Sequence, residues 1–363
     1  MSDLLILAGP RARALIARDG LQAAQIAAIP AAAGGPKGLI LSALDRWLFS
    51  TWLPGAPRER SLIGASIGAW RMAAACFPDA DAGLAELAQH YCAQHYSAKP
   101  DQQEVTHKVK QLLTDWVGPQ AQAICQHPHY RLHILAVRGL RALQYAQERS
   151  AQRGAFGAAA LANLGSRRAL ARHLERVLIS DARDDLSWLG WQRGFDAFHN
   201  QRVTLTPENL RQALLASGTL PLIMQAVPDI AGAAPGLYWD GGMIDYHLAW
   251  PWQGLGADEL VLYPHFTTQV TPGWFDKILP WRRHLPAAQR AWLENMVLLA
   301  PGPDFVRRLP RRKLPDRKDF QFHGQNHLAR ARDWQRAIDE AQALRDALME
   351  FIARPDPKRL LPL

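Results

Sequence analysis

Cysteines and long apolar runs are scarce in this chain. Its 363 residues include three cysteines, Cys76, Cys92 and Cys125, which are widely spaced and odd in number. Such a set does not form a disulfide framework and is typical of a reducing compartment. No stretch approaches the roughly eighteen apolar residues of a membrane span. The N-terminal residues also lack the basic flank of a secretion signal, so we expect a first strand there and a cytoplasmic protein.

Short apolar runs alternate with helical patterns along the chain. This alternation predicts an α/β protein whose mainly parallel sheet is covered by helices on both faces. The segment 271–318 is rich in proline and arginine and is expected to be a loop, whereas residues 326–354 carry one apolar stripe and predict a final helix that docks on the domain. We expect strands at 4–8, 26–32, 61–64, 130–137, 176–180 and 259–263, and helices at 11–18, 67–76, 207–216 and, as a pair, within 80–116.

The turn Gly64-Ala65-Ser66-Ile67-Gly68 lies between an expected strand and an expected helix. In this G-x-S-x-G arrangement the turn is so tight that the serine is strained, its neighbours must be small, and its hydroxyl is exposed above the end of the sheet. The following helix directs its N-terminal N–H groups toward the site, where they favour developing negative charge. These features predict that Ser66 is the nucleophile of a serine acyl hydrolase.

A glycine cluster at 33–38 also comes directly after an expected strand. An acyl-transfer site needs N–H donors aimed at the oxygen that becomes an oxyanion, and glycines let the backbone approach that oxygen. The Walker phosphate loop is excluded because Gly38 follows Lys37, and the dinucleotide pattern lacks its first glycine because Ala33 stands there. A tight turn without a ligand is the alternative. Pro36 has no N–H, so the expected oxyanion donors are Gly34, Gly35, Lys37, Gly38 and Ile67.

A serine nucleophile needs a group that takes its proton. Asp240 stands at the end of an expected strand, before Gly241 and Gly242, and these glycines would let the loop come close to Ser66. A carboxylate becomes an effective base only in a desolvated pocket, where its pKa rises. The sequence therefore predicts Asp240 as the base, with an Asp-Gly hairpin turn as the alternative interpretation.

Together these elements resemble the patatin-like phospholipase family, in which a glycine-rich loop, G-x-S-x-G and D-G-G or D-G-A follow one another in this order. The segment 216–221, Ala-Ser-Gly-Thr-Leu-Pro, is similar to the family's A-S-x-x-x-P segment, and Asp245 matches an aspartate that often follows the D-G-G. The resemblance covers about residues 26–263.

That resemblance implies a fold, a site and a substrate class. The fold would be a three-layer α/β/α arrangement with a catalytic domain over residues 1–265, while residues 266–363 form a basic loop segment and a C-terminal helix packed on the core. The site would be a Ser66–Asp240 dyad without a histidine, together with the oxyanion loop at 34–38. The substrate would be a lipid or another ester, and neither a cofactor nor a metal would be required.

Two other reactions could use the same serine. In an ordinary α/β-hydrolase a Ser-His-Asp triad would act, and His247, seven residues after Asp240, is the foremost candidate. His265 and His323 would compete with it, because the histidine of that fold lies on a late loop. An acyltransferase that uses Ser66 is the second alternative.

Cys125, His127, His129 and His133 have the composition of a metal-binding cluster. A zinc site needs these side chains to converge, whereas side chains of the strand that follows point alternately to opposite faces. We therefore expect a polar loop that leads into a strand, and no metal.

Positive charge is concentrated in one segment. The chain carries a net charge of +9, and residues 276–318 alone hold eleven Lys and Arg against four Asp and Glu. We interpret the run from Arg307 to Lys318 as a surface for anionic lipid headgroups, with Trp274 and Trp281 at the interface. Nucleic-acid binding is disfavoured because the expected substrate is a lipid. The alternative without a binding partner is a solvated surface whose arginines pair with nearby acidic side chains. A non-catalytic lipid-binding or nucleic-acid-binding protein that acts through this run is the alternative to an enzyme.

Overall fold

The computed structural model describes residues 3–363 as an α/β protein with one large, mixed, mostly parallel sheet. The strands follow the order β11-β1-β10-β9-β2-β3-β4-β5-β6, while β8 pairs with β4 and with β7. The antiparallel pairs are β1 with β10, β4 with β5, β4 with β8, and β7 with β8. The strands are β1 Leu4–Ala8, β2 Ile26–Ala31, β3 Arg60–Ala65, β4 Tyr130–Gly139, β5 Leu174–Ser180, β6 Asn200–Thr204, β7 Val227–Pro228, β8 Leu237–Asp240, β9 Leu260–Pro264, β10 Met296–Pro301 and β11 Leu360–Pro362.

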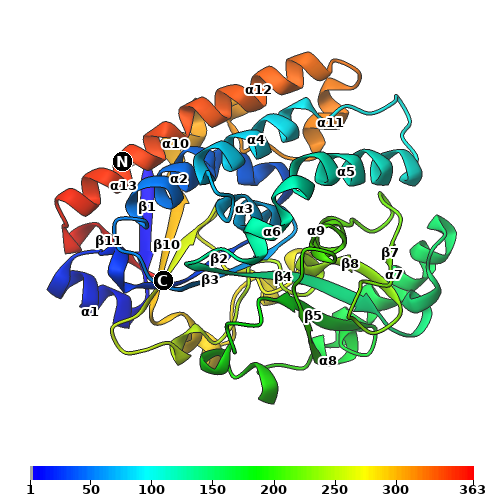
Figure 1. The fold of residues 1–363 in the computed structure, drawn as a ribbon, viewed down its shortest axis with the longest axis horizontal. Coiled ribbons are helices and arrows are strands. Elements are labelled where there is room, and N and C mark those ends of the chain that lie inside the picture. Colours follow the sequence, from blue (N-terminus) through cyan, green and yellow to red (C-terminus); the bar gives the residue numbers. More distant parts are fainter. Residues whose placement is uncertain (1–2) are drawn as a thin grey trace.

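Helices are stacked over the sheet (Figure 1). α3 packs directly on β3, α4 packs on α3, and α12 packs on α4, so the C-terminal helices form the outermost part of this stack. The helices are α1 Pro10–Asp19, α2 Ser42–Trp47, α3 Ile67–Ala75, α4 Ala80–Ala93, α5 Gln102–Trp116, α6 Ala121–Cys125, α7 Arg149–Gly165, α8 Arg167–Leu170, α9 Leu210–Gly218, α10 Pro303–Arg308, α11 Lys318–His323, α12 His327–Glu340 and α13 Gln342–Ala353.

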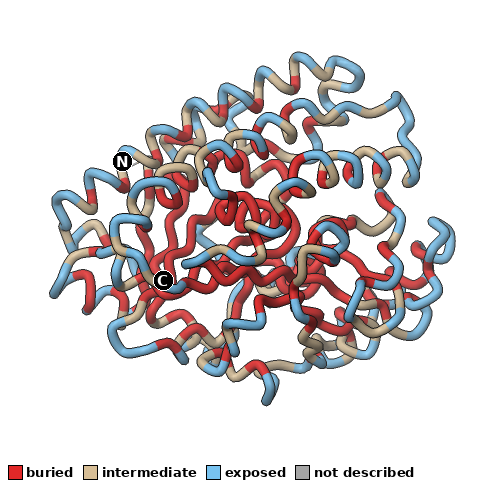
Figure 2. The backbone as a smooth tube through the Cα atoms, viewed as in Figure 1, coloured by how far each residue is buried: buried red, intermediate tan, exposed pale blue. Residues whose placement is uncertain are grey.

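The core lies along the central strands. Every residue of β2, β3, β9 and β10 is buried, and Figure 2 shows this buried band running through the middle of the molecule. Successive side chains of a strand point to opposite faces, so continuous burial means that both faces of the sheet are covered. Apolar residues predominate in these strands because both of their faces pack against other parts of the protein.

The six predicted strands are confirmed to within two residues at each end. The prediction of a loop over 271–318 is wrong in part, because β10 lies inside it and is inserted between β1 and β9. Its sequence, Met-Val-Leu-Leu-Ala-Pro, is an apolar run typical of a buried strand, but the prolines and arginines around it dominate the composition of the segment. The sheet thus extends across the expected boundary at residue 265, since β10 and β11 both belong to it.

Two predicted helices differ from the structure in their bounds. The helix expected at 207–216 is α9, which begins at Leu210, because Thr206 and Asn209 bond each other's backbone N–H groups and form a turn before it. The final helix is divided into α12 and α13, which meet at Ala341. Its apolar stripe is buried as expected, including Trp334 and Phe351.

Candidate active site

Ser66 and Asp240 meet at the point along β4 where the neighbouring strand changes from β3 to β8. β3 pairs with β4 as far as Ala65, which lies opposite Leu135. The next residue of β4, Ala136, pairs with Asp240, the last residue of β8. Because both pairings are on the same edge of β4, the end of β8 lies directly beyond the end of β3 (Figure 1). The register of the sheet therefore brings the two predicted residues together.

Ser66 has the strained backbone expected of a G-x-S-x-G turn. Its φ of 58° and ψ of −131° lie in a region that non-glycine residues rarely adopt. The flanking glycines have no room for a side chain. A Cβ on Gly68 would lie 2.0 Å from the carbonyl oxygen of Ala31, and one on Gly64 would lie 2.4 Å from the backbone nitrogen of Ala69.

The C-terminal end of α9 and the residue after it hold both residues in place. The N–H of Ser66 donates to the hydroxyl of Ser217 at 2.9 Å, and the N–H of Asp240 donates to the carbonyl of Thr219 at 3.0 Å. Ser217 and Thr219 are fully buried. The 216–221 segment, expected to pack near the site, thus supplies the contacts that fix the distance between β3 and β8.

The carboxyl group of Asp240 is buried beside the hydroxyl of Ser66. It accepts a hydrogen bond from the N–H of Gly242 at 2.7 Å, and the hydroxyl of Ser66 lies near enough to favour its charged form. Burial raises the pKa of Asp240 to about 6, while the hydroxyl of Ser66 and the charge of Arg317 act in the opposite direction. Above that pH the group is a carboxylate that can take a proton from Ser66.

Ser66 and Asp240 open into a pocket of about 530 Å³. A volume of this size accommodates a small organic ester. Apolar side chains form much of its wall, and charged side chains gather at one part of it. The lining residues include Leu220, Pro221, Leu222, Ile223, Met243, Tyr246 and Trp274, with Lys37, Lys277, Asp316, Arg317 and Lys318.

The glycine loop lies against the same pocket. Gly34 and Lys37 line it, and a Cβ on Gly34 would lie 2.5 Å from the ring of Phe266, so only glycine fits there. Gly35 has a φ of 57° and begins a 3₁₀ helix, while Ile67 begins α3. The first N–H groups of a helix have no partner within it, so these turns offer donors near Ser66. Gly38 packs against the Ile67 side chain.

None of the pocket-lining residues among those described is a histidine. His247 and His265 are buried against one another, with ring centroids 4.3 Å apart. Burial lowers the pKa of His247 well below its usual value and that of His265 to about 3. His323 lies on α11 and contacts Asp333 at 3.1 Å. The three histidines considered for a triad therefore do not line the Ser66 pocket.

Asp245, which also follows the D-G-G, has a structural partner. Its two oxygens accept from the guanidinium of Arg176 at 2.6 and 2.9 Å, and one also accepts from the indole of Trp250 at 2.8 Å. Arg176 is fully buried and bonds Asp196 as well. A buried ion pair of this kind holds loop to sheet and leaves Asp245 no free oxygen for chemistry.

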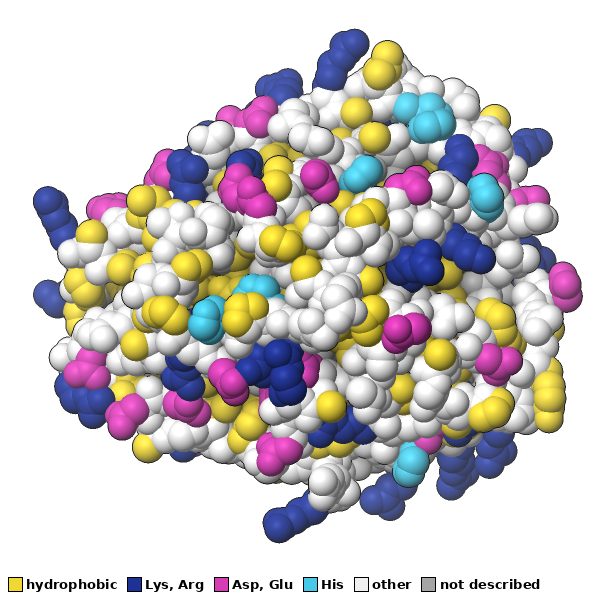
Figure 3. All heavy atoms as spheres, viewed as in Figure 1, with side chains coloured by type: hydrophobic (Ala, Val, Ile, Leu, Met, Phe, Trp, Pro, Cys, Tyr) yellow, Lys and Arg dark blue, Asp and Glu magenta, His cyan; other side chains and the backbone are white. Residues whose placement is uncertain are grey.

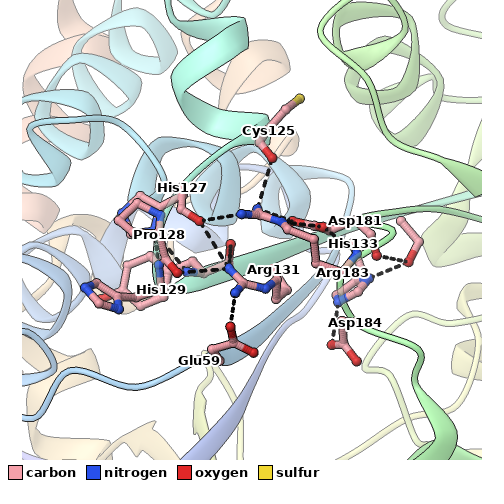
Figure 4. A network of polar contacts seen from close by, with 12 residues as sticks. Glu59, Cys125, His127, Pro128, His129, Arg131, His133, Asp181, Arg183 and Asp184 are labelled. Carbon is pink, nitrogen blue, oxygen red and sulfur yellow. Dashed lines mark hydrogen bonds and ion pairs between the residues drawn. The ribbon is translucent and has the colours of Figure 1, made fainter.

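The side chains of the Cys125 cluster do not converge (Figure 4). The Nδ1 atom of His127 accepts from the N–H of Tyr130 at 2.9 Å, whereas His133 points into the core and bonds Ser180 at 2.8 Å and Asp184 at 3.0 Å. Within residues 3–363 no group of three His, Cys, Asp or Glu side chains is placed to hold a metal ion. Ser180, although next to a histidine and an aspartate, is fully buried and inaccessible to substrate.

Most cations of the basic run are ion-paired. Arg307 pairs with Asp304, Arg308 with Asp3 and Glu340, and Arg311 and Lys313 with Asp319. On the face drawn in Figure 3, Lys and Arg side chains alternate with Asp and Glu and form no single patch. This pairing matches the solvated surface that was the alternative interpretation for the first part of the run.

Several pocket residues escaped the sequence analysis. Tyr246, Lys277 and Arg317 come from three separate segments and have no recognisable spacing to Ser66. The only signal was the positive charge of residues 276–318, which does not show which cations face the pocket.

Comparison of the chain with protein-family models, with curated proteins and with solved structures finds no match. The chemistry of this site must therefore be argued from its own residues.

Proposed function

We propose that this protein is a lipid acyl hydrolase of the patatin-like type, with a three-layer α/β/α fold and a Ser66–Asp240 dyad. One observation carries the proposal: a serine in a strained turn and a buried carboxyl group whose pKa is about 6 line the same pocket, and the serine hydroxyl acts on that pKa. The strained turn presents the hydroxyl to the pocket, and desolvation makes the carboxylate basic enough to accept its proton.

The reaction follows from these positions. The Oγ of Ser66 bonds to the ester carbonyl carbon while its proton passes to Asp240, and the negative charge that collects on the carbonyl oxygen is stabilised by backbone N–H groups of the 34–38 loop and Ile67. The bond to the alcohol then breaks, and the alcohol takes the proton from Asp240. Water repeats the attack with Asp240 as base, which releases the acid and restores Ser66.

The test is covalent labelling combined with an ester panel. We expect a fluorophosphonate probe to label the wild type on the peptide that contains Ser66, as identified by mass spectrometry. The wild type should also release fatty acid from phospholipids or simpler esters. Absence of both label and hydrolysis would overturn the proposal, and transfer of the acyl group to an added alcohol or lysolipid at the expense of hydrolysis would reassign the protein as an acyltransferase.

The pH dependence of the reaction is the next prediction. Asp240 acts only as a carboxylate, so kcat/KM for a neutral ester should fall as the pH drops through about 6. The positive charge of Arg317 favours the carboxylate and lowers its pKa. Arg317→Gln removes that charge, so the acidic limb should move to higher pH. A limb that stays in place in the variant, or a wild-type limb near the usual aspartate pKa, would contradict this account.

Membrane contact is a further part of the proposal. Within residues 3–363 we find no helix with the length and apolar character needed to cross a bilayer. We propose that the protein is cytoplasmic and reaches lipid as a peripheral protein, through Trp274 and Trp281, which are 44% and 71% exposed, and through those cations of the run from Arg307 to Lys318 that have no ion-pair partner among the described residues. Sedimentation with phosphatidylserine vesicles tests this.

A further inference from the structure

Four cations line the Ser66 pocket without a carboxylate partner among the described residues, and three of them, Lys37, Lys277 and Arg317, act on one another's charge. Lys37, Lys277 and Arg317 line the pocket, and none of the described Asp or Glu side chains lies within ion-pair distance of them. Asp316 also lines the pocket, but its carboxylate contacts the ammonium group of Lys313 at 3.1 Å. The charge of the three cations is therefore not neutralised by a direct contact within this part of the chain.

These cations lie close to one another and to the reacting groups. Lys37 lies within the glycine loop, and its ammonium group is 5.1 Å from the ring centre of Phe266. Arg317 is next to Gly35, whose Cβ would lie 3.3 Å from the guanidinium, and its charge acts on Asp240. Lys277 is 5.5 Å from the ring centre of Tyr246, another lining residue. The three cations therefore line the pocket into which Ser66 opens.

The repulsion among these cations lowers the pKa of the two lysines. Burial, followed by the charge of Lys277, lowers the pKa of Lys37 to about 8, and burial followed by the charge of Arg317 lowers the pKa of Lys277. The charge of Asp316 raises the pKa of both lysines but does not offset these effects. Like charges held close together are unfavourable for folding. A bound anion would relieve this repulsion, as an acidic side chain does for Arg311 and Lys313 a few residues away.

We propose that Lys37, Lys277 and Arg317 form a subsite for an anionic group, a phosphate or a carboxylate, carried by the ester that Ser66 attacks. The inference rests on the proposed hydrolase function and narrows its substrate class to anionic acyl esters. Lys and Arg are the side chains that bind phosphate and carboxylate best, and the pocket wall makes their charge more effective than in bulk water.

The experiment compares matched esters that share a hexanoyl chain, which keeps them monomeric. They are hexanoyl glycerol, hexanoyl glycerol phosphate, hexanoyl glycerophosphocholine and the hexanoyl ester of lactate. We expect wild-type kcat/KM to be at least about tenfold higher for one of the two anionic esters than for the neutral one, a difference typical of a charge-assisted contact. Which anionic ester is preferred distinguishes phosphate from carboxylate.

Substitutions then assign the preference to this subsite. In the Lys277→Gln/Arg317→Gln protein the ratio of kcat/KM for anionic over neutral ester should fall by about tenfold. Arg312→Gln removes an exposed cation of the same basic run that does not line the pocket, and the ratio should stay unchanged. Isothermal titration of Ser66→Ala with the phosphate ester and with hexanoyl glycerol supplies a readout independent of turnover.

The outcomes separate the two proposals. Equal or greater hydrolysis of the neutral ester by the wild type, or an anionic preference that survives in the double variant, overturns the subsite while leaving the hydrolase intact. Failure of the wild type to hydrolyse any of the esters, together with an unlabelled Ser66, overturns the hydrolase and the subsite with it.

Discussion

Ser66→Ala, Asp240→Asn and the doubly substituted protein are each expected to hydrolyse an ester about 10⁴-fold more slowly than the wild type. The two residues act as one unit, because the proton that leaves the Ser66 hydroxyl must be taken by Asp240 in the same step. Removal of either therefore abolishes the same reaction, and removal of both costs little more. Steady-state kcat/KM of the three variants, normalised to folded protein, measures this.

His247→Asn is the matched control for that experiment. In a Ser–Asp dyad it should retain most of the activity, because His247 is buried beside His265 and does not line the pocket. Counting active sites by fluorophosphonate labelling corrects for any loss of folded protein. A collapse of activity per labelled site in this variant would favour a triad over the dyad. Additive losses in the Ser66 and Asp240 variants would show that these two residues do not act as one unit.

Gly68→Ala is expected to destabilise the fold by about 3 kcal/mol or more, because the new methyl group would overlap backbone that cannot move freely. Its Cβ would lie 2.0 Å from the carbonyl oxygen of Ala31, at the end of the central strand β2. That cost corresponds to a decrease in Tm of roughly 4 °C for a chain of 363 residues that unfolds as one unit. Thermal unfolding followed by circular dichroism is the measurement.

Gly154→Ala provides the comparison for Gly68. Gly154 lies within α7, and a Cβ placed on it meets no other atom within 4 Å. Alanine favours helix over glycine by about 1 kcal/mol, so this variant should be slightly more stable than the wild type. If both variants unfolded at the wild-type temperature, the tight approach of α3 to β2 would not be a feature of the protein.

Local sequence was sufficient for the parts of this protein that depend on neighbouring residues. The six strands, the turn around Ser66 and the glycine loop each combine an apolar run with glycines at fixed spacing, and the backbone must follow such a pattern wherever it lies. The strain at Ser66 is an example, since its φ of 58° follows from the tightness of a five-residue turn. β10 was missed because its six apolar residues are surrounded by prolines and arginines.

The sequence by itself determined the α/β class and nominated Ser66 and Asp240, whereas the tertiary structure decided that they meet. They are far apart in the chain, and only the exchange of β3 for β8 along β4 brings them together. The positions of the charged groups were likewise decided by the tertiary structure. Composition showed a basic segment, but only packing determined that Arg311 and Lys313 contact Asp319 while Arg317 and Lys277 face the pocket. Pairing depends on three-dimensional proximity, which a linear pattern does not encode.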